Sequence, residues 1–281
     1  MKLKYSLFTT TSLVMALSLY AKTQDRWDGN HYQEHSHMQE ESAFFLLDSI
    51  TFKKTDNVLD IGCGDGKITA QISKIANLGQ TVGLDISKNM IDHAKKTYAN
   101  IPNLSFVQAD ATNFTLDNTF DYVISFYTIH WVKDLENCLK SIKNVLKPNG
   151  KVFIKIATMH KDCPIQKYFD RLDPQGKWSK AKQGRKNTFH GSKTAKEFQT
   201  SLENAEFLYN KVEIFNESFN FENFDAFVEW ISAWGAYCVE LPQDEAKLFF
   251  QEMIATIYAS QNKKHEEPIV FTFPVLQAEA S

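Results

Sequence analysis

Apolar and polar residues alternate along this chain in two periods, one typical of helices and one typical of strands. In residues 34–50 the apolar positions recur every three or four residues, which predicts an amphipathic helix. From residue 57 onward, short β-rich runs alternate with segments of helix length. The predicted strands are 57–61, 81–86, 104–109, 121–126 and 151–157, and the predicted helices among them are 67–76, a helix capped by Ser87, and 134–146. This order indicates βαβ units in an α/β fold with a doubly wound, mostly parallel sheet.

The second half of the chain continues the alternation but ends on a run that fits less well. The predicted elements there are a helix at 194–207, a β-rich run at 211–221, helices at 224–237 and 243–261, and an apolar run at 268–276. Aromatic residues share one face of the helix at 224–237, a stripe that is more often core than ligand site but can also form an apolar pocket wall. Pro274 lies inside the last run and argues against a central strand position and a terminal hairpin.

The composition fits one compact core in residues 25–281. With 281 residues, 43% of them apolar, the chain is long enough for a single large domain. A formal net charge of −3 provides no general field for a polyanion, so we expect no nucleic-acid partner. The cysteines have no C-x-x-C spacing, which fits neither a zinc site nor a disulfide framework, and we expect free thiols and no metal. They are Cys63, Cys138, Cys163 and Cys238.

The N-terminus, residues 1–24, has the layout of a secretory signal and is kept out of the fold. Two lysines precede an apolar, uncharged stretch at 7–21 that is short for a membrane span. Leu19 is unusually large for the position before a cut after residue 21, and Met15 offers an internal start that removes both lysines. We therefore predict a cytoplasmic protein without a stable membrane span, with export as the alternative.

A glycine-rich loop follows the first predicted strand, in VLDIGCGDG at residues 58–66. It joins a strand to a helix, where backbone N–H groups can hold an anion or a polar ligand. Its glycines read G-x-G-x-G, not the G-x-G-x-x-G of dinucleotide sites, and acids stand at Asp60 and Asp65. By the sign of Coulomb's law these acids repel a pyrophosphate and tolerate a ligand with an ammonium and a sulfonium group. An ordinary glycine turn is the alternative.

Two further acids end the next two predicted strands. Asp85 ends TVGLD, where a carboxylate can accept both hydroxyls of a ribose that lies across the strand tips. Asp110 follows FVQA, where an acid beside an apolar wall can accept the exocyclic amino group of adenine. Each acid alone is compatible with a surface carboxylate. Acids at the ends of three consecutive predicted strands indicate one ligand site.

The ordered set DIGCGDG, GLDIS, QADA, FDYVISFYTIHWV and LKPNGKVFI resembles class I S-adenosylmethionine-dependent methyltransferases, over about residues 57–156. The resemblance implies a Rossmann-like fold and S-adenosylmethionine as the cofactor. It also implies a cofactor-binding core at 57–158 and a helical insertion over the acceptor site at 159–200. The cofactor-binding residues that it implies are Asp60, Gly62, Gly64 and Gly66 at the amino acid part, Asp85 at the ribose, Asp110 and Ala111 at the adenine, and also Ile86 and Phe126.

Two further segments, WDGNHYQEHSHMQ and SFYTIHWVKD, resemble a subgroup that includes juvenile hormone acid, trans-aconitate and malonyl-acyl-carrier-protein methyltransferases. Those enzymes methylate carboxylates. The resemblance places Tyr32 and Gln39 over the cofactor, with Gln39 also reaching the substrate. It places Trp131 and His130 in the acceptor pocket. The N-P-P-Y type tetrad of many base and amide methyltransferases is absent after the fourth strand, which disfavours nucleic-acid bases.

These residues suit transfer of a methyl group to a carboxylate. A carboxylate is ionised at neutral pH, so the transfer needs no base and depends on alignment in a dry pocket. Gln39, His130 and Trp131 can each donate a hydrogen bond to it without a full counter-charge. Trp131 as a core anchor and His130 as a packed histidine are the structural alternatives.

The predicted function is therefore a small-molecule methyltransferase that acts on an apolar or carrier-bound carboxylic acid. If His130 is a base, the acceptor is instead a small phenol or amine. A cofactor-binding protein without catalysis is a third possibility. A basic run at 177–186, within the insertion, either is a solvated surface loop or steers an acidic substrate or carrier toward the pocket. The oligomeric state stays open.

Overall fold

The computed structural model describes residues 25–158, 167–168, 172, 176–181, 190, 193–239 and 241–281, without the side chain of Cys238. The signal-like leader at 1–24 and much of the predicted insertion at 159–200 lie outside the described residues. Cys63 and Cys138 are buried free thiols. In the described part of the chain, no helix combines the length and the apolar composition that crossing a membrane requires.

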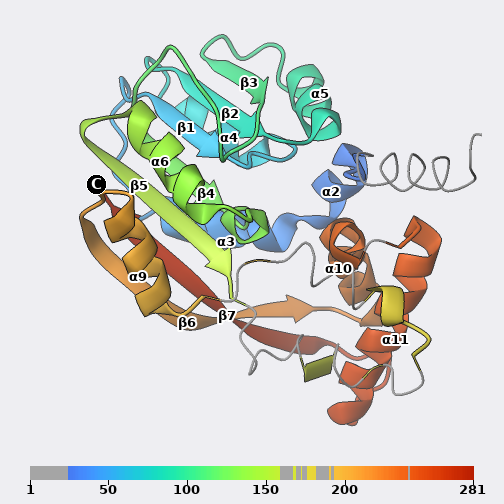
Figure 1. Ribbon diagram of the computed structural model, residues 1–281. Coiled ribbons are helices and arrows are strands. Elements are labelled where there is room, and N and C mark those ends of the chain that lie inside the picture. Colours follow the sequence, from blue (N-terminus) through green and yellow to red (C-terminus); the bar gives the residue numbers. More distant parts are fainter. Residues whose placement is uncertain are drawn as a thin grey trace, which may run out of the picture.

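A seven-stranded sheet runs through the described residues (Figure 1). Its strands are β1 (Val58–Ile61), β2 (Thr81–Asp85), β3 (Leu104–Gln108), β4 (Phe120–Phe126), β5 (Leu146–Ala157), β6 (Tyr209–Phe221) and β7 (Ile269–Ala280). The order is β3-β2-β1-β4-β5-β7-β6, and only β7 runs antiparallel to its neighbours β5 and β6. The predicted doubly wound, mostly parallel sheet is confirmed. Its strand order reverses between β1 and β4, the point where such sheets bind ligands.

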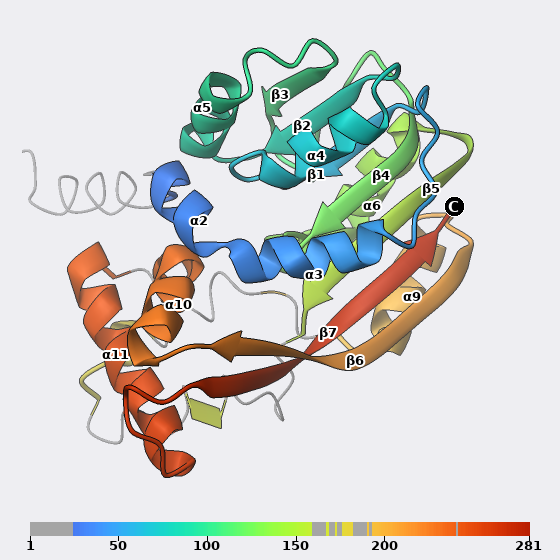
Figure 2. The same ribbon diagram turned by 180° about the vertical axis from the view of Figure 1, so that it is seen from behind.

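Helices cover both faces of the sheet. They are α2 (Gly29–His35), α3 (His37–Leu47), α4 (Lys67–Ile75), α5 (Lys88–Thr97), the 3-10 helix η1 (Ile129–Trp131), α6 (Leu135–Val145), α9 (Ala195–Asn204), α10 (Phe224–Val239) and α11 (Gln243–Ser260). Figure 1 shows α6 and α9 on one face, and Figure 2 shows α3 and α4 on the other. Leu139 and Phe198 are fully buried on the first face, and Ala43 and Ile72 on the second. The apolar stripes of the helices thus bury both sides of the sheet.

Local capping signals set several helix ends. The Ser87 side chain accepts a hydrogen bond from the Met90 N–H at 3.1 Å, which confirms the predicted cap of α5. At the start of α9, Thr194 and Glu197 form a reciprocal capping box. These bonds satisfy N–H groups that the first helical turn leaves without partners.

A second apolar core lies where β6 and β7 continue beyond the parallel strands and meet α10 and α11 (Figure 1). It is rich in aromatic rings, such as Phe221 and Phe227, which stack with centroids 4.1 Å apart. The aromatic stripe on α10 belongs to this core, as its pattern predicted, and Phe227 and Trp230 are buried there. This second core positions α10 beside α2.

The helix predicted at 34–50 is confirmed for its larger part as α3, but residues 34 and 35 belong to a separate helix, α2, and the two helices meet at Ser36. Asp28 caps α2 by accepting hydrogen bonds from the N–H groups of Asn30 and His31, so the first helix begins upstream of the apolar pattern. α2 packs against α5 and α10, whereas α3 packs against α4. The two helices serve different parts of the molecule, which periodicity within one window does not reveal.

The strand predicted at 151–157 begins earlier than expected. α6 ends at Val145, one residue before the predicted end at 146, and β5 starts at once with Leu146. β5 pairs with β4 at Leu146 and again from Lys151 onward, with a register shift between them. Pro148 and Gly150 therefore lie in an irregular stretch of strand and not in a separate turn.

The expectation drawn from Pro274 is wrong, because β7 is a central strand between β5 and β6. The pairing of β7 with β5 ends at Val275, which faces Ala157, whereas Pro274 faces only Asn216 of β6. Proline lacks an N–H but keeps its carbonyl, which accepts from the Thr158 N–H at 3.0 Å. Pro274 therefore lies just beyond the last residue paired with β5, where its missing N–H removes no bond to that strand.

Candidate active site

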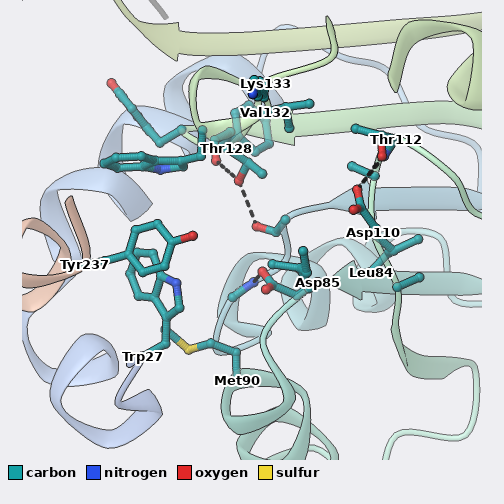
Figure 3. A pocket seen from close by; sticks show the side chains of 18 of the residues that line it. Trp27, Leu84, Asp85, Met90, Asp110, Thr112, Thr128, Val132, Lys133 and Tyr237 are labelled. Atoms are coloured by element: carbon teal, nitrogen blue, oxygen red, sulfur yellow. Dashed lines mark hydrogen bonds between the residues drawn. The ribbon is translucent and has the colours of Figure 1, made fainter. Parts of the chain in front are cut away.

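A cavity of about 340 Å³ opens at the carboxyl ends of β1, β2 and β4. Figure 3 shows Asp85 and Asp110 on its strand side, with Trp27 and Tyr237 across from Asp85. We refer to it as the first cavity. Its volume lies in the range of cavities that bind small molecules and cofactors.

Two smaller cavities adjoin the first. The second cavity, of about 50 Å³, is walled by rings such as Trp131 and Trp234. The third cavity, of about 30 Å³, lies between the glycine loop and α3, beside Asp65. Tyr32 and Tyr127 line all three cavities, so a ligand in the first one borders both of the others.

The structure brings the predicted site residues together in these walls, with one exception. The first cavity is lined by Tyr32, Gly62, Gly64, Asp85, Ile86, Asp110, Ala111, Phe126 and Trp131, the second also by Gln39 and His130, and the third also by Asp60. Gly66 lines none of them.

A side chain at each of the three loop glycines would meet different surroundings. All have positive φ, but a Cβ on Gly62 would lie 2.0 Å from Thr128 Oγ1, and one on Gly66 would lie 2.7 Å from the Phe106 ring. At Gly64 the nearest atom would be a Tyr32 ring carbon at 3.7 Å. Only Gly64 therefore keeps its side-chain space open toward the cavity. The protein's own core fills the space beside Gly66, so this glycine leaves no room there for a ligand, and its cofactor-binding role stays a prediction.

Asp85 is held by the backbone of two loops. Its Oδ2 accepts from the Gly64 N–H at 3.0 Å, and its Oδ1 accepts from the Ser87 N–H at 2.8 Å. A carboxylate has about four acceptor positions, so each oxygen retains capacity for one more donor. The bonds orient Asp85 without using up its ability to bind a pair of hydroxyls.

Asp110 and its neighbours form a more open part of the first cavity. Asp110 Oδ1 accepts from both the N–H and the hydroxyl of Thr112 at 2.8 Å, which leaves Oδ2 as an acceptor. Ile86 is 59% exposed beside it, and Ala111 is buried. An exposed apolar side chain next to an oriented acceptor suits a flat, polar-edged ring.

Burial raises the pKa of three acids around the glycine loop. Burial, opposed by one hydrogen bond, raises the pKa of Asp60 to about 7, and burial raises that of Asp85 to about 6. Burial also raises the pKa of Asp65, and within the described residues its buried Oδ2 has no hydrogen-bond partner. A bound cation would reverse these shifts, because it stabilises the charged carboxylates. The arrangement therefore favours a positively charged ligand.

Segments from α2 and α10 close the side of the first cavity that faces away from the strands. Trp27 stacks on Tyr237 of α10 with centroids 5.2 Å apart, and its edge meets the Tyr32 ring at 5.7 Å. Burial, together with nearby carboxylates, raises the pKa of the Tyr32 hydroxyl. Tyr32 therefore stays a neutral hydrogen-bond donor at the boundary between the cavities.

The second cavity combines aromatic walls with a few polar groups. Gln39 is buried, and its Oε1 accepts a hydrogen bond from the Trp230 indole at 3.0 Å. An amide whose oxygen is engaged in this way offers its NH₂ group as a donor. Trp131 borders both the first and the second cavity. The aromatic stripe of α10 thus belongs to the core and also forms a pocket wall, through Trp230 and Trp234.

His130 is 4% exposed and lies in the wall of the second cavity. Burial lowers the pKa of its imidazole to about 3, because a charged ring loses its hydration there. His130 is therefore neutral throughout the physiological range. A neutral imidazole carries one N–H donor, but with this pKa it is a weak base.

A polar network behind Tyr127 is absent from the sequence predictions. Glu217 of β6 accepts a hydrogen bond from the Tyr127 hydroxyl and forms an ion pair with Lys155 at 2.7 Å. Lys155 is fully buried in β5 and also donates to the Ser42 carbonyl at 3.2 Å. The one signal in the sequence was a lysine inside the otherwise apolar run VFIKIA. The network fixes Tyr127, which borders all three cavities.

The predicted basic run at 177–186 is only partly described. Lys177 forms an ion pair with Glu252 of α11 and lies over the Trp178 ring at 4.5 Å from its centroid. The remaining basic residues from Lys182 onward lie outside the described residues. The steering role of the run stays a prediction.

A family model described as a methyltransferase domain matches residues 59–154, the segment from β1 into β5. Juvenile hormone acid O-methyltransferase of Drosophila melanogaster is 28% identical over 252 residues, which cover 84% of each chain. Malonyl-[acyl-carrier protein] O-methyltransferase 1 of Ilyobacter polytropus is 29% identical over 159 residues, which cover 57% of each chain. Protein 235L of Invertebrate iridescent virus 6 is 35% identical over 133 residues, 47% of this chain and 49% of the viral one. The last two matches thus span about half of the relatives' lengths.

Among solved structures, the YcgJ protein of Bacillus subtilis is similar to this chain with a TM-score of 0.61. The two chains are 19% identical, and the superposition covers 86% of this chain and 97% of the bacterial one. At this identity the likeness concerns the fold alone.

Proposed function

We propose that this chain, which is a class I S-adenosylmethionine-dependent methyltransferase, forms a methyl ester on a small or carrier-bound carboxylic acid. The acceptor class is the proposal, and two relatives that are named carboxyl O-methyltransferases support it. The observation that carries it is the second cavity. Its described lining is aromatic, contains no Lys or Arg, and includes donors that are neutral at physiological pH.

The residues of the first and third cavities fit the cofactor. S-adenosylmethionine supplies a methyl group on a positively charged sulfur, and it also carries an ammonium group, a ribose and an adenine. Asp65 Oδ2, a buried oxygen without a described partner, would accept from the ammonium group. The free acceptor positions of Asp85 suit the two ribose hydroxyls, and Asp110 with Ile86 suits the adenine. The raised pKa of Asp60 and of Asp85 is a cost of burial that this cation would offset.

The acceptor would be held in the second cavity by donors that do not neutralise it. The Gln39 amide and the Trp131 indole can donate to a carboxylate, and neutral His130 adds one ring N–H. A Lys or Arg would stabilise the carboxylate in its ground state and lower its nucleophilicity. With neutral donors in an aromatic cavity that excludes water, the oxygen remains reactive, and the rate depends on alignment.

The alternative with His130 as a base gains no support from this geometry. Proton removal from a phenol or an ammonium works best when the pKa of the base lies near the working pH, and burial holds the pKa of His130 at about 3. A carboxylate acceptor needs no proton removal, so the same neutral histidine is compatible with it.

The test is methyl transfer from S-adenosylmethionine with a labelled methyl group to matched acceptors. Each apolar carboxylic acid, and malonyl-acyl-carrier protein, is compared with its own amide and with a phenol of similar size. We expect label only on the acids, in a product that mild base releases as methanol, since esters hydrolyse under these conditions. Label on the phenols or amides alone would refute the carboxylate assignment. Binding of the cofactor without any transfer would favour the non-catalytic alternative.

A further inference from the structure

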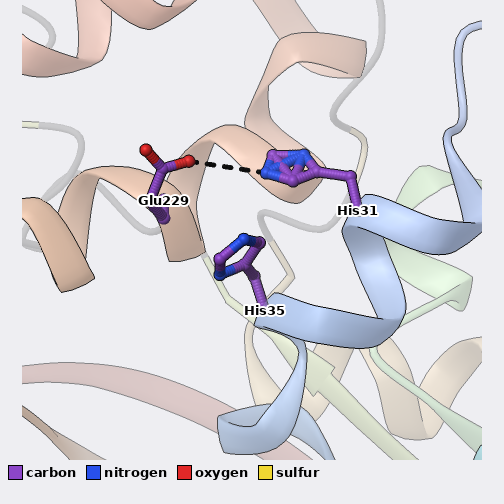
Figure 4. Close-up of side chains that lie close together, drawn as sticks. All are labelled: His31, His35 and Glu229. Carbon is purple, nitrogen blue, oxygen red and sulfur yellow. Dashed lines mark ion pairs between the residues drawn. The ribbon is translucent and has the colours of Figure 1, made fainter.

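Three potential metal ligands come together between α2 and α10, and none of them is among the described residues that line the three cavities. His31 and His35 are one turn apart on α2, so their side chains share a face of the helix. Glu229 of α10 lies beside them, and Figure 4 shows its carboxylate directed at the His31 imidazole, with the His35 ring next to both. His31 Nε2 lies 3.5 Å from Glu229 Oε2, and the two imidazole centroids are 4.6 Å apart.

The donor set matches the coordination chemistry of zinc. Each of the three residues offers one ligand atom, and these atoms lie within 4.8 Å of one another. Zinc takes imidazole nitrogen and carboxylate oxygen at about 2.0–2.2 Å, so ligands around one ion lie ~3–4 Å apart. The present separation requires only a small rotation of side chains that are partly exposed, 24% for His31 and 30% for Glu229. Two histidines and one carboxylate leave a fourth position for water.

The charged residues around the cluster leave one oxygen of the Glu229 carboxylate available to bind an ion. Lys247 of α11 holds Glu229 Oε1 at 2.5 Å, while Oε2 faces the histidines. The Lys247 charge opposes a cation, and Glu34 on α2 contributes negative charge next to His35. A hydrogen-bonded oxygen beside a free one on the same carboxylate is a common arrangement around bound metals, because the outer partner orients the ligand.

We propose that His31, His35 and Glu229 bind one divalent transition-metal ion, zinc, which fastens α2 to α10. The residues next to these ligands line the second cavity, since Tyr32 follows His31 in the sequence and Trp230 follows Glu229. The bound ion therefore holds together the two segments that close the cavities. Hard ions such as Mg²⁺, which prefer oxygen ligands, do not replace it.

The first experiment is calorimetric titration of the full chain, freed of metal with a chelator and then dialysed, with zinc chloride. We expect one site that His35→Ala and Glu229→Gln each weaken at least tenfold. His37→Ala is the matched control, because His37 is an exposed histidine two residues away and outside the cluster. Equal affinity in wild type and both variants, or no binding by the wild type, would overturn the proposal. Circular dichroism verifies that each variant is folded, and His31→Gln replaces either one that is not.

The second experiment tests the connection between the helices and is independent of methyl transfer. Amide hydrogen exchange of residues 29–35 is measured with and without zinc, and with magnesium as the comparison ion. We expect zinc to slow exchange there at least fivefold in the wild type and in His37→Ala, but not in His35→Ala. Unchanged exchange in the zinc-bound wild type would overturn the claim that the ion fastens α2.

Discussion

The first cavity, to which we assign the cofactor, and the second cavity, to which we assign the acceptor, are built in different ways. The first cavity uses the turns of the glycine loop and carboxylates at or near the carboxyl ends of parallel strands, such as Asp85 at the last residue of β2 and Asp110 shortly after β3. The acceptor side is assembled from rings far apart in the sequence, such as Trp131 of η1 and Trp230 of α10. Charge and loop geometry therefore determine the lining of the first cavity, whereas tertiary packing determines the lining of the second cavity. Because of this difference, we expect some substitutions to change cofactor affinity and others to change the stability of the aromatic wall.

The largest expected effect concerns the buried ion pair behind the acceptor wall. Lys155→Met removes the partner of Glu217 at a position with no solvent access. We expect the free energy of unfolding to fall by about 3–4 kcal/mol, because breaking a buried pair leaves a charge without compensation. Chemical denaturation measures this change. Lys151→Met is the control, since Lys151 lies on the same strand and its pair with Glu279 of β7 is partly exposed, and the change should lower stability by less than about 1 kcal/mol.

A similar loss from both lysine variants would contradict this assignment, because the buried and the exposed pair would then contribute alike. It would also remove the evidence that the Tyr127 network stabilises the junction between the two sides.

The glycine loop offers the next sharpest contrast. Gly66→Ala should lower the free energy of unfolding by about 3 kcal/mol, because it adds a left-handed backbone penalty to a clash with the Phe106 ring. Gly64→Ala incurs only the backbone penalty, about 1 kcal/mol, but places a methyl group at the open side of the first cavity. Thermal unfolding and cofactor titration of both variants check this. Equal stability losses, or intact cofactor affinity in Gly64→Ala, would contradict the different roles.

Cofactor affinity should depend on Asp85 far more than on acids elsewhere. We expect Asp85→Ala to weaken S-adenosylmethionine binding roughly 100-fold, about 2.7 kcal/mol, because it removes two charge-assisted hydrogen bonds in a buried setting. Asp117→Ala, at an exposed position outside all three cavities, is the control and should bind like the wild type. Calorimetry with S-adenosylmethionine and S-adenosylhomocysteine measures both. Affinity within threefold of the wild type would show that Asp85 does not hold the ribose.

The smallest expected effect is a pH dependence with opposite signs for binding and stability. Burial raises the pKa of Asp60 to about 7 and that of Asp85 to about 6, above the ordinary value of 3.8. Protonated acids do not attract a cation, so cofactor affinity should fall roughly tenfold between about pH 8 and about pH 5.5. Without cofactor the folded state binds more protons than the unfolded state, so the contribution of these groups to stability falls as pH rises from about 4 to 7. Calorimetry and thermal unfolding across this range test both signs, and a flat affinity would be incompatible with them.

The sequence predicted which residues gather around the first cavity because their signals are local, and their roles toward the cofactor stay predictions. Asp85 is the last residue of β2, Asp110 follows the end of β3 by two residues, and Ser87 caps α5 two positions after Asp85, so each residue can be placed from its own segment. The role of Gly66 could not be read in this way. A glycine with positive φ has the same pattern whether the space it leaves is filled by a ligand or by a distant ring.

The acceptor side depends on contacts that no local window contains. Tyr127 and Glu217 are 90 positions apart, and Gln39 and Trp230 are 191 apart, yet each pair is hydrogen-bonded. His130 read as a residue that titrates near neutrality, and only the depth of its burial shows that it stays neutral. Pro274 was misplaced for a related reason, because its tolerance in β7 depends on where β5 ends.

The Phe106 ring has an evolutionary consequence. It fills the side-chain space of two glycines at once, since a Cβ on Gly83 would lie 2.6 Å from it and one on Gly66 would lie 2.7 Å from it. Only Gly66 also has positive φ. A Cβ on Gly83 would also lie 2.9 Å from Cys63 Sγ, so during sequence divergence alanine at position 83 requires smaller residues at both 106 and 63. Positions 63, 83 and 106 should therefore covary among homologues, whereas the positive φ of Gly66 should keep position 66 glycine.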